Sequence, residues 1–208
     1  MLRDAAVKII NYRLGNRRMD EVILAEMDFI QRSVLERRAW LPWFLETELA
    51  SASTQAGERR VALPPDFLME IEEESLWIET SEGGLVELEK TDYDRAMRTL
   101  PGSGQPVAYA LASGYFQFFP KPDAAYTLQM RYYAQGESIA LTNVEVSWLL
   151  HAADLVVAEV GLVIAEKHLQ NANLAASFRD SAAQALKTLQ DRHVAMQEVN
   201  RIRLVGGE

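Results

Sequence analysis

The chain of 208 residues contains no cysteine. A disulfide framework, a thiolate metal site and a cysteine nucleophile are therefore excluded. The absence of cysteine indicates folding in a reducing cytosol, or folding that does not depend on the redox state. The N-terminal stretch also lacks the uncharged apolar core of a signal peptide, because Arg3, Asp4, Lys8 and Arg13 interrupt it. We therefore expect no export by the usual route.

The chain has no uncharged apolar run that is long enough to cross a membrane. Its most apolar stretch, Val144 to about His168, is interrupted by Asp154, Glu159 and Glu166, whereas a membrane span needs about 18 to 20 apolar residues. A helix that is apolar on almost every side is buried on most sides. We expect this segment to be a core helix, which in a ring would pack against its own subunit and a neighbour.

Positive charge is in deficit, with 21 Lys and Arg against 30 Asp and Glu and a formal net charge of −9. Residues 1–60 carry ten basic against nine acidic side chains, residues 61–120 three against eleven, and residues 121–208 eight against ten. The negative charge is therefore concentrated in the middle. This balance argues against a protein that holds DNA phosphates over its whole surface.

Helical periodicity marks both ends of the chain. One apolar face runs from Leu2 to Leu14 and stops at Gly15-Asn16, and a second helix begins near Met19 and ends before Pro42. A final amphipathic helix is predicted from about Asn173 to Asn200.

Strand patterns fill the middle of the chain. The first five are predicted at 44–49, 59–63, 67–72, 76–79 and 85–88. A short helix over Thr91 to Leu100 follows, with Thr91 and Asp94 resembling a capping box. Three runs rich in aromatic and β-branched residues then predict an antiparallel meander at 107–111, 115–120 and 126–133. The segment 120–123 should not continue a ladder, because its two prolines lack an N–H.

These patterns predict an α+β fold. We expect a helical bundle from the N- and C-terminal helices, residues 1–42 and 142–200, into which a small antiparallel β-rich domain, residues 43–141, is inserted. Residues 201–208 are predicted to be a flexible C-terminal tail.

His151 and Asp154 lie three residues apart in the long apolar helix, with Ser147 one turn earlier. The three side chains would form a polar stripe like that of a relay or a metal site. A metal site needs more ligands, and the next carboxylate, Glu159, points elsewhere. We predict a structural or interface role, with no catalytic residue, no metal and no cofactor. The two other histidines are predicted to be solvated: His168 and His193.

Glutamates cluster at Glu70, Glu72 and Glu74, with Glu79 and Glu82 nearby. Such carboxylates are able to coordinate a cation. Alternation along a strand offers a simpler account, because the first three share one face while apolar residues occupy the other. We favour a solvated acidic face over a metal site.

An aromatic cluster, Trp40, Trp43 and Phe44 beside Pro42, stands where helix gives way to strand. One interpretation is packing at a hinge between the helical and β-rich parts. The other is an exposed protein interface, since Trp is over-represented at binding hot spots. The sequence does not choose between them.

Four segments carry a resemblance to a known family, in their order and spacing. They are Leu63-Pro-Pro-Asp66, Tyr115-Phe-Gln-Phe-Phe-Pro-Lys-Pro-Asp123, Met130-Arg-Tyr-Tyr133 and Leu141-Thr-Asn-Val-Glu-Val-Ser-Trp-Leu-Leu150. Together they resemble the head-to-tail adaptor (connector, neck) proteins of short-tailed bacteriophages, over roughly Trp40 to Ala165.

The resemblance implies a structural virion protein and not an enzyme. It implies a homo-oligomeric ring, commonly a dodecamer, that lies beneath the portal protein, extends the DNA channel and provides the platform for tail or nozzle proteins. DNA would pass through without specific binding, and no membrane is involved. The expected location is the neck of the virion, and the host cytoplasm during assembly.

Two sets of residues are candidates for contacts with other proteins. The C-terminal segment alternates basic and apolar residues and is too short to bury them alone, so we expect it to dock on the portal through Arg201, Ile202, Arg203, Leu204 and Val205. The apolar helix supplies the candidate subunit interface: Trp148, His151, Asp154 and Leu155.

The alternative is a small ligand-binding or regulatory domain with a helical dimer interface, or an enzyme that uses His151 and Asp154. A DNA-binding regulator would show a basic recognition helix, and none of the helical patterns is strongly basic. An enzyme would show a denser set of polar residues. The connector is therefore the favoured hypothesis.

Overall fold

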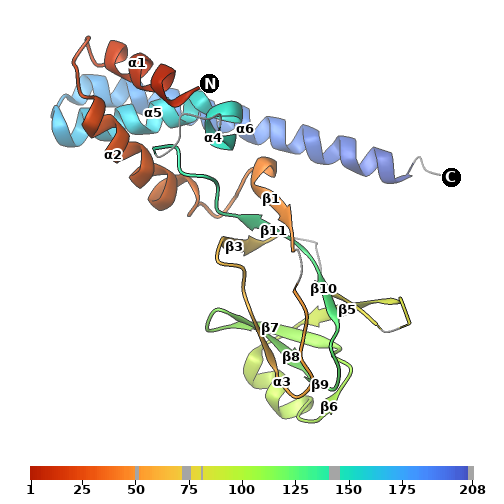
Figure 1. The fold of residues 1–208 in the computed structure, drawn as a ribbon. Helices are drawn as coiled ribbons and strands as arrows, with labels where there is room; N and C mark the ends of the chain where they lie inside the picture. Colours follow the sequence, from red (N-terminus) through yellow and green to blue (C-terminus); the bar gives the residue numbers. More distant parts are fainter. Residues whose placement is uncertain (50–51, 72–75, 81, 141–145, 206–208) are drawn as a thin grey trace. The chain divides into compact units, whose positions relative to one another are not determined.

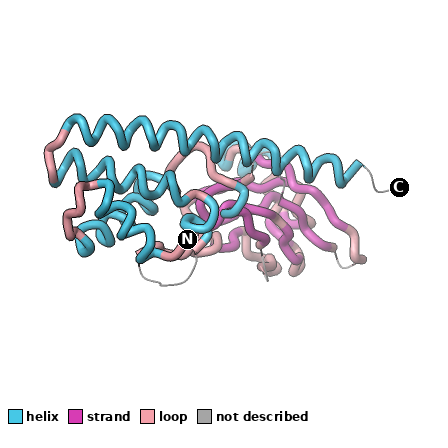
Figure 2. The backbone as a smooth tube through the Cα atoms, turned by 90° about the horizontal axis from the view of Figure 1, so that it is seen from above, coloured by secondary structure: helices cyan, strands magenta, loops and turns pink. Residues whose placement is uncertain are grey.

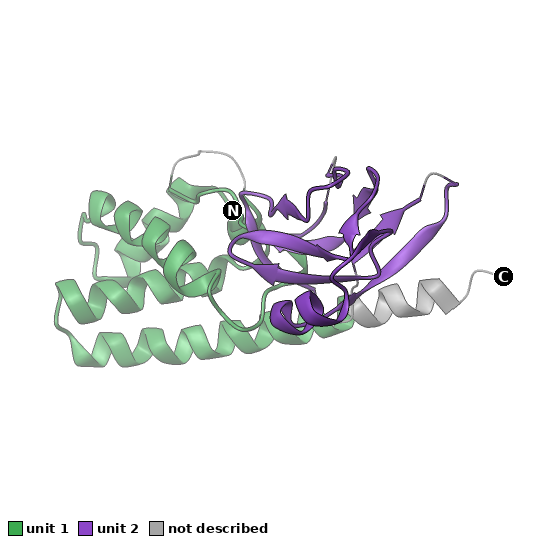
Figure 3. Cartoon of the chain, turned by 90° about the horizontal axis from the view of Figure 1, so that it is seen from below, with its two compact units in different colours: residues 1–45, 135–208 green, residues 46–134 purple. Residues whose placement is uncertain are grey.

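The computed structural model describes residues 1–49, 52–71, 76–80, 82–140 and 146–205, of which 197–205 are described by their backbone alone. The chain forms two compact units, Met1–Leu45 with Gln135–Glu208, and Glu46–Ala134. Figure 3 shows the first unit as helices and the second as a curled set of strands. The α+β class predicted from the sequence is confirmed.

Two helices open the helical unit, α1 (Arg3–Arg13) and α2 (Asp20–Ile30). The turn between them uses the left-handed region, with φ of 82° at Gly15 and 58° at Asn16, as the Gly-Asn pair predicts. Asn11 holds this turn closed. Its side-chain amide donates to Asp20 Oδ1 at 2.5 Å, and its Oδ1 accepts from the backbone N–H of Met19 at 3.0 Å.

The C-terminal half of the helical unit contains α4 (Ser147–His151), α5 (Ala153–Val163), the π-helix η3 (Ile164–His168) and the long α6 (Ala172–Val205). The chain folds back after η3, so that α6 packs along α5 (Figures 1 and 2). Asn171 caps α6, because its Oδ1 accepts from the backbone N–H of Leu174 at 3.1 Å. The helix continues five residues beyond the predicted end at Asn200, and 206–208 lie outside the described residues.

The apolar helix predicted as one piece is in fact divided. Ala152 has φ of −136° and ψ of 32°, which ends α4 and lets α5 start at the next residue. The break leaves α5 apolar and buried, with Val156, Ala158 and Val160 all at 0% exposure. The helix α2 is likewise followed by a π-helical turn, η1 (Gln31–Leu35).

Short strands build the second unit, and among the described residues they form three sheets. Two are small, with strand orders β1-β11-β3 and β6-β9, and the largest has the order β10-β4-β5-β7-β8-β2. The strands are β1 (Glu46–Glu48), β2 (Arg60–Ala62), β3 (Phe67–Glu70), β4 (Leu76–Glu79), β5 (Leu85–Lys90), β6 (Ser103–Gly104), β7 (Ala108–Ala112), β8 (Tyr115–Phe119), β9 (Lys121–Pro122), β10 (Thr127–Gln129) and β11 (Arg131–Ala134).

The predicted meander is right in its first hairpin and wrong in its third strand. Strands β7 and β8 pair antiparallel around Ser113-Gly114, where φ is 54° and 80°. The run 126–133 does not pair with β8. It divides into β10, which pairs with β4, and β11, which pairs with β1 and β3. The partner of β8 on the side away from β7 is β2.

Two pairings are parallel, so the β unit is mixed and not purely antiparallel. Strand β5 pairs parallel with β7, and α3 (Tyr93–Thr99) lies between them in the chain. Lys121–Pro122 also forms a short parallel ladder with β6, against the prediction that its prolines exclude it. The ladder survives because Lys121, which keeps its N–H, donates to the carbonyl of Gly102 at 3.0 Å.

The short helix α3 begins with a cap one residue later than predicted. Asp92 is the N-cap, and its carboxylate accepts from the backbone N–H of Arg95 at 3.0 Å.

The core of the β unit is aromatic and aliphatic, with Leu76, Ile78, Phe116 and Phe118 fully buried. The β unit therefore has a core of its own.

Candidate functional site

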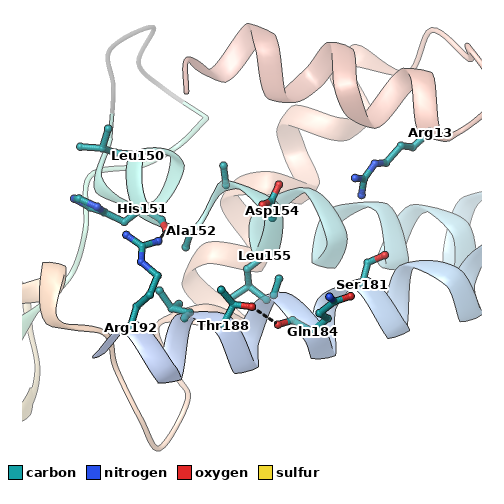
Figure 4. A pocket seen from close by; sticks show the side chains of 13 residues that line it. Arg13, Leu150, His151, Ala152, Asp154, Leu155, Ser181, Gln184, Thr188 and Arg192 are labelled. Atoms are coloured by element: carbon teal, nitrogen blue, oxygen red, sulfur yellow. Dashed lines mark hydrogen bonds between the residues drawn. The ribbon is translucent and has the colours of Figure 1, made fainter. Parts of the chain in front are cut away.

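A hollow of about 460 Å³ lies on the surface of the helical unit, where α4 and α5 face α6. Figure 4 shows Asp154 on α5, Thr188 and Arg192 on α6 and Arg13 at the end of α1 around it. It contains the two residues, His151 and Asp154, on which the sequence places most of its candidate chemistry. The geometry of this hollow therefore decides between an enzyme site and a contact surface.

The break at Ala152 separates the two candidate residues. His151 is the last residue of α4, and Asp154 is in the first turn of α5, where a carboxylate interacts favourably with the helix dipole. They do not form the stripe along one helix that the sequence predicts. In the described part of the chain, neither a hydrogen bond nor an ion pair joins Asp154 to His151, and Asp154 is exposed.

His151 is held by an aromatic ring and a cation. Its imidazole stacks on Phe44 at 5.2 Å between centroids, and its carbonyl accepts from Arg192 Nη1 at 2.9 Å. Burial, and then the positive charge of Arg192, lower the pKa of His151 below its usual value. The ring is therefore neutral near pH 7, without a carboxylate to orient it as a general base requires.

His193 is buried in the helical unit at 4% exposure, so the prediction that it is solvated is wrong. Its Nδ1 accepts the backbone N–H of Trp43 at 3.1 Å, and Trp40 meets its ring edge to face at 5.1 Å. Burial lowers the pKa of His193. The sequence does carry a signal for this burial: His193 comes four residues after Leu189, which is buried, and residues at this spacing share one face of a helix.

The aromatic cluster at 40–44 packs against the rest of the helical unit, with Trp40, Trp43 and Phe44 each half-buried. Phe44 lies edge to face with Trp148 at 5.1 Å, and Arg192 stacks on Trp43 at 5.2 Å. The other histidine, His168, also has a partner, because its Nε2 lies 3.0 Å from Glu26 Oε1. His168 is exposed, so the prediction that it is solvated is confirmed.

A buried polar network escaped the sequence-based predictions. Glu36, at 4% exposure, accepts from the indole N–H of Trp148 at 3.2 Å, from the Gly136 N–H at 3.1 Å and from the Gln31 side-chain amide at 2.7 Å. Gln31 in turn accepts from the N–H of Ile139 at 2.9 Å. The network joins the segment after β11 to η1, the π-helical turn that follows α2.

The structure sorts the four predicted interface residues into two pairs. Trp148 and Leu155 are 1% and 2% exposed and lie in the core of their own chain, so they have no surface to offer a neighbour. His151 and Asp154 reach the surface beside Leu150, which is 53% exposed. The portal-docking residues 201–205 continue α6, and their side chains lie outside the description.

The predicted acidic face is only partly a solvated surface. Glu70 accepts from the hydroxyl of Tyr109 at 2.5 Å and forms an ion pair with Lys90. Burial, this hydrogen bond and the charge of Glu70 raise the pKa of Tyr109. Glu72 and Glu74 lie outside the described residues. Within the described ranges, no group of three or more His, Asp or Glu side chains is arranged to hold a metal ion.

None of the helices in the described part of the chain is both long enough and apolar enough to cross a membrane.

The hollow around His151 combines a neutral histidine, an unpaired carboxylate and an exposed leucine, without a nucleophile–base pair. This set of groups suits a contact surface better than a reaction.

Comparison with known proteins gives the chain a family. No curated protein matches it. The sequence profile of the SU10 adaptor protein family matches residues 3–203, which is nearly the whole chain and includes both units. The resemblance inferred from the four sequence segments is thereby confirmed. The chain belongs to the SU10 adaptor protein family, a family of phage head-to-tail adaptors with a structural role in the virion.

Proposed function

We propose that copies of this chain, twelve in number, form a ring beneath the portal of a phage capsid, extend its DNA channel and provide the platform for tail or nozzle proteins. The observation that carries the proposal is the family match over residues 3–203. Because the match includes both the helical and the β unit, the function should need both. In this proposal the chain acts in the neck of the virion and assembles in the host cytoplasm.

Different parts of the chain have different tasks in this proposal. The helical unit forms the ring, and His151 and Asp154 contribute to the contact between subunits because they reach the surface next to the exposed Leu150. The residues 201–205 at the end of α6 dock on the portal. The β unit contacts the tail components.

The charge of the chain fits a conduit for DNA. Residues 61–120 carry a net charge of −8, from three basic and eleven acidic side chains. Carboxylates repel phosphates, so a wall with this charge would let DNA pass without holding it.

The test is binding to purified portal rings. The full chain and a chain truncated after Asn200 are mixed with the portal, and the complexes are counted by native mass spectrometry and viewed by electron microscopy. We expect twelve copies of the full chain per portal, and at least tenfold weaker binding of the truncated chain. A full chain that does not bind the portal would contradict the function; a truncated chain that binds as well would contradict only the docking role of 201–205.

A further inference from the structure

A cluster of basic residues surrounds the turn between α1 and α2. Residues 5–19 contain four Lys and Arg and no Asp or Glu, in a chain whose net charge is −9. All four basic side chains are exposed. Arg13 lies at the hollow beside Asp154, and the other three line a second hollow, which we call the basic turn: Lys8, Arg17 and Arg18.

Two carboxylates, Asp4 and Asp20, line the same hollow as the cations of the basic turn, but neither forms an ion pair with them in the described residues. The nearest acidic side chains along the sequence are already engaged, since Asp4 pairs with Arg3 at 3.1 Å and Asp20 accepts from Asn11 at 2.5 Å. Within the described residues, none of the four basic side chains takes part in an ion pair or a side-chain hydrogen bond. The turn itself is held rigid by Asn11, so the charges are presented from a fixed backbone.

Apolar side chains are exposed beside these charges. Tyr12, four residues after Lys8 and therefore on the same side of α1, is 73% exposed, and Ile9 is 38% exposed. Tyr and Arg are the residue types enriched in protein interfaces. The combination favours a protein partner over DNA, because contacts with a phosphate backbone require cations and make no use of exposed aliphatic side chains.

The same chain carries a surface of the opposite charge. Residues 76–89 contain four glutamates and no basic residue. The described residues of this range, 76–80 and 82–89, belong to the antiparallel pair of β4 and β5, in which Glu79 lies opposite Leu85. Leu85 is 53% exposed, and Glu82 and Glu89 are exposed as well. We call this surface the acidic hairpin.

We propose that the basic turn of one copy docks on the acidic hairpin of a neighbouring copy. The two surfaces carry opposite charges, and each has an exposed hydrophobic side chain, Tyr12 or Leu85, to bury. They are different surfaces of one chain, so the contact is heterologous. A heterologous contact leaves both surfaces free at the ends until a ring closes.

This inference rests on the proposed ring and names one contact that would build it. Single exposed ion pairs contribute little, so the contact depends on several charges acting together and on closure of the ring. It should weaken with salt, because the Debye length falls from about 8 Å at 0.15 M to about 3 Å at 1 M.

The test exchanges the charges between two variants. The first is Arg17→Glu/Arg18→Glu, and the second is Glu82→Arg/Glu89→Arg. Each variant alone places like charges opposite one another at the exchanged positions, whereas an equal mixture restores opposite charges at those positions of every contact if the two alternate around the ring. Native mass spectrometry and sedimentation report the oligomers, and circular dichroism confirms that each variant is folded.

We expect each variant alone to need at least tenfold more protein for self-association than the wild type. The equal mixture should assemble like the wild type, into oligomers with equal numbers of the two variants. The control, Lys187→Glu/Arg98→Glu, reverses two exposed cations outside the basic turn and should assemble normally.

Four results would overturn the inference. They are a wild type that stays monomeric at every concentration, variants that assemble unchanged, a mixture that assembles no better than its components, and loss of duplex DNA binding in Arg17→Glu/Arg18→Glu with unchanged self-association. The last result would make the basic turn a nucleic-acid surface. Portal binding, measured separately, keeps the proposed function testable in each case.

Discussion

The ring of Phe178 in α6 lies against the backbone of Gly161 in α5. A Cβ built at residue 161 would come within 2.3 Å of Phe178 Cε1 and 2.5 Å of its Cζ. Phe178 is 3% exposed and Gly161 is buried, so the ring has little room to move away. Glycine at this position therefore sets how closely α5 and α6 pack.

Gly161→Ala should destabilise the chain even though alanine is the better helix former. Overpacking of a core typically costs about 1 to 3 kcal/mol, which exceeds the gain in helix propensity of about 1 kcal/mol. Urea unfolding measures the change. Gly102→Ala is the control, because nothing lies within 4 Å of its Cβ position. Equal stability of both variants would show that α5 and α6 separate easily.

Glu36→Ala should be among the most damaging substitutions in the helical unit. It removes the acceptor of the Trp148 indole N–H, which is buried, and of the Gly136 N–H, which is partly buried. Unpaired buried donors of this kind cost about 3 to 5 kcal/mol in total. Thermal unfolding monitored by tryptophan fluorescence measures the loss. The exposed neighbour Glu137→Ala is the matched control and should unfold like the wild type.

Local patterns predicted the helices at both ends and the β7–β8 hairpin, because each depends on neighbouring residues. Gly15 and Gly114 both take the positive φ that their turns need. The break at Ala152 gives no such signal, since alanine is the strongest helix former. Packing of α4 and α5 around it, and not its own preference, decides its conformation.

Most of the remaining wrong predictions concern contacts between residues that are far apart in the sequence. The run 126–133 has the alternation of one strand, but its two halves pair with different partners, β4 on one side and β1 and β3 on the other. In the buried polar network, Gln31 and Glu36 are five residues apart, and the π-helical turn η1 brings both side chains into one network. Neither arrangement follows from a periodicity of 2 or 3.6 residues.

The stability of the helical unit should fall as the pH drops below about 6.5. Burial lowers the pKa of His193 in the folded chain, while the unfolded chain keeps a value of about 6.5. The unfolded state therefore binds more protons below pH 6.5, and stability that is complete above that pH is lost as the pH falls toward the folded pKa. Urea unfolding midpoints at pH 7.5, 6.5 and 5.5 measure this slope.

His193→Asn separates the effect of protonating the side chain from the effect of losing its hydrogen bond with the Trp43 N–H. The amide oxygen of Asn is able to accept from the Trp43 N–H in place of Nδ1, but Asn does not titrate. The variant should be less stable than the wild type at pH 7.5 and should lose much less stability between pH 6.5 and 5.5. A pH slope as steep as that of the wild type would assign the effect to other groups.

Free DNA should bind the chain weakly at physiological salt. The charge of −8 over residues 61–120 opposes phosphates within a Debye length of about 8 Å. Fluorescence anisotropy with a labelled duplex measures the affinity at 0.15 M salt, and the same titration at lower salt serves as the control. A dissociation constant in the micromolar range or tighter would contradict the prediction and favour a DNA-binding regulator.

Asp154→Ala should leave the fold intact and act on assembly instead. Asp154 is exposed, so the loss of its side chain changes stability little. His151→Ala removes the ring that stacks on Phe44 and should cost more stability. Phage assembled with each substitution decides their role. Normal unfolding with fewer tailed particles for Asp154→Ala would support a contact between subunits, whereas normal particles that fail at an enzymatic step would reject the structural role.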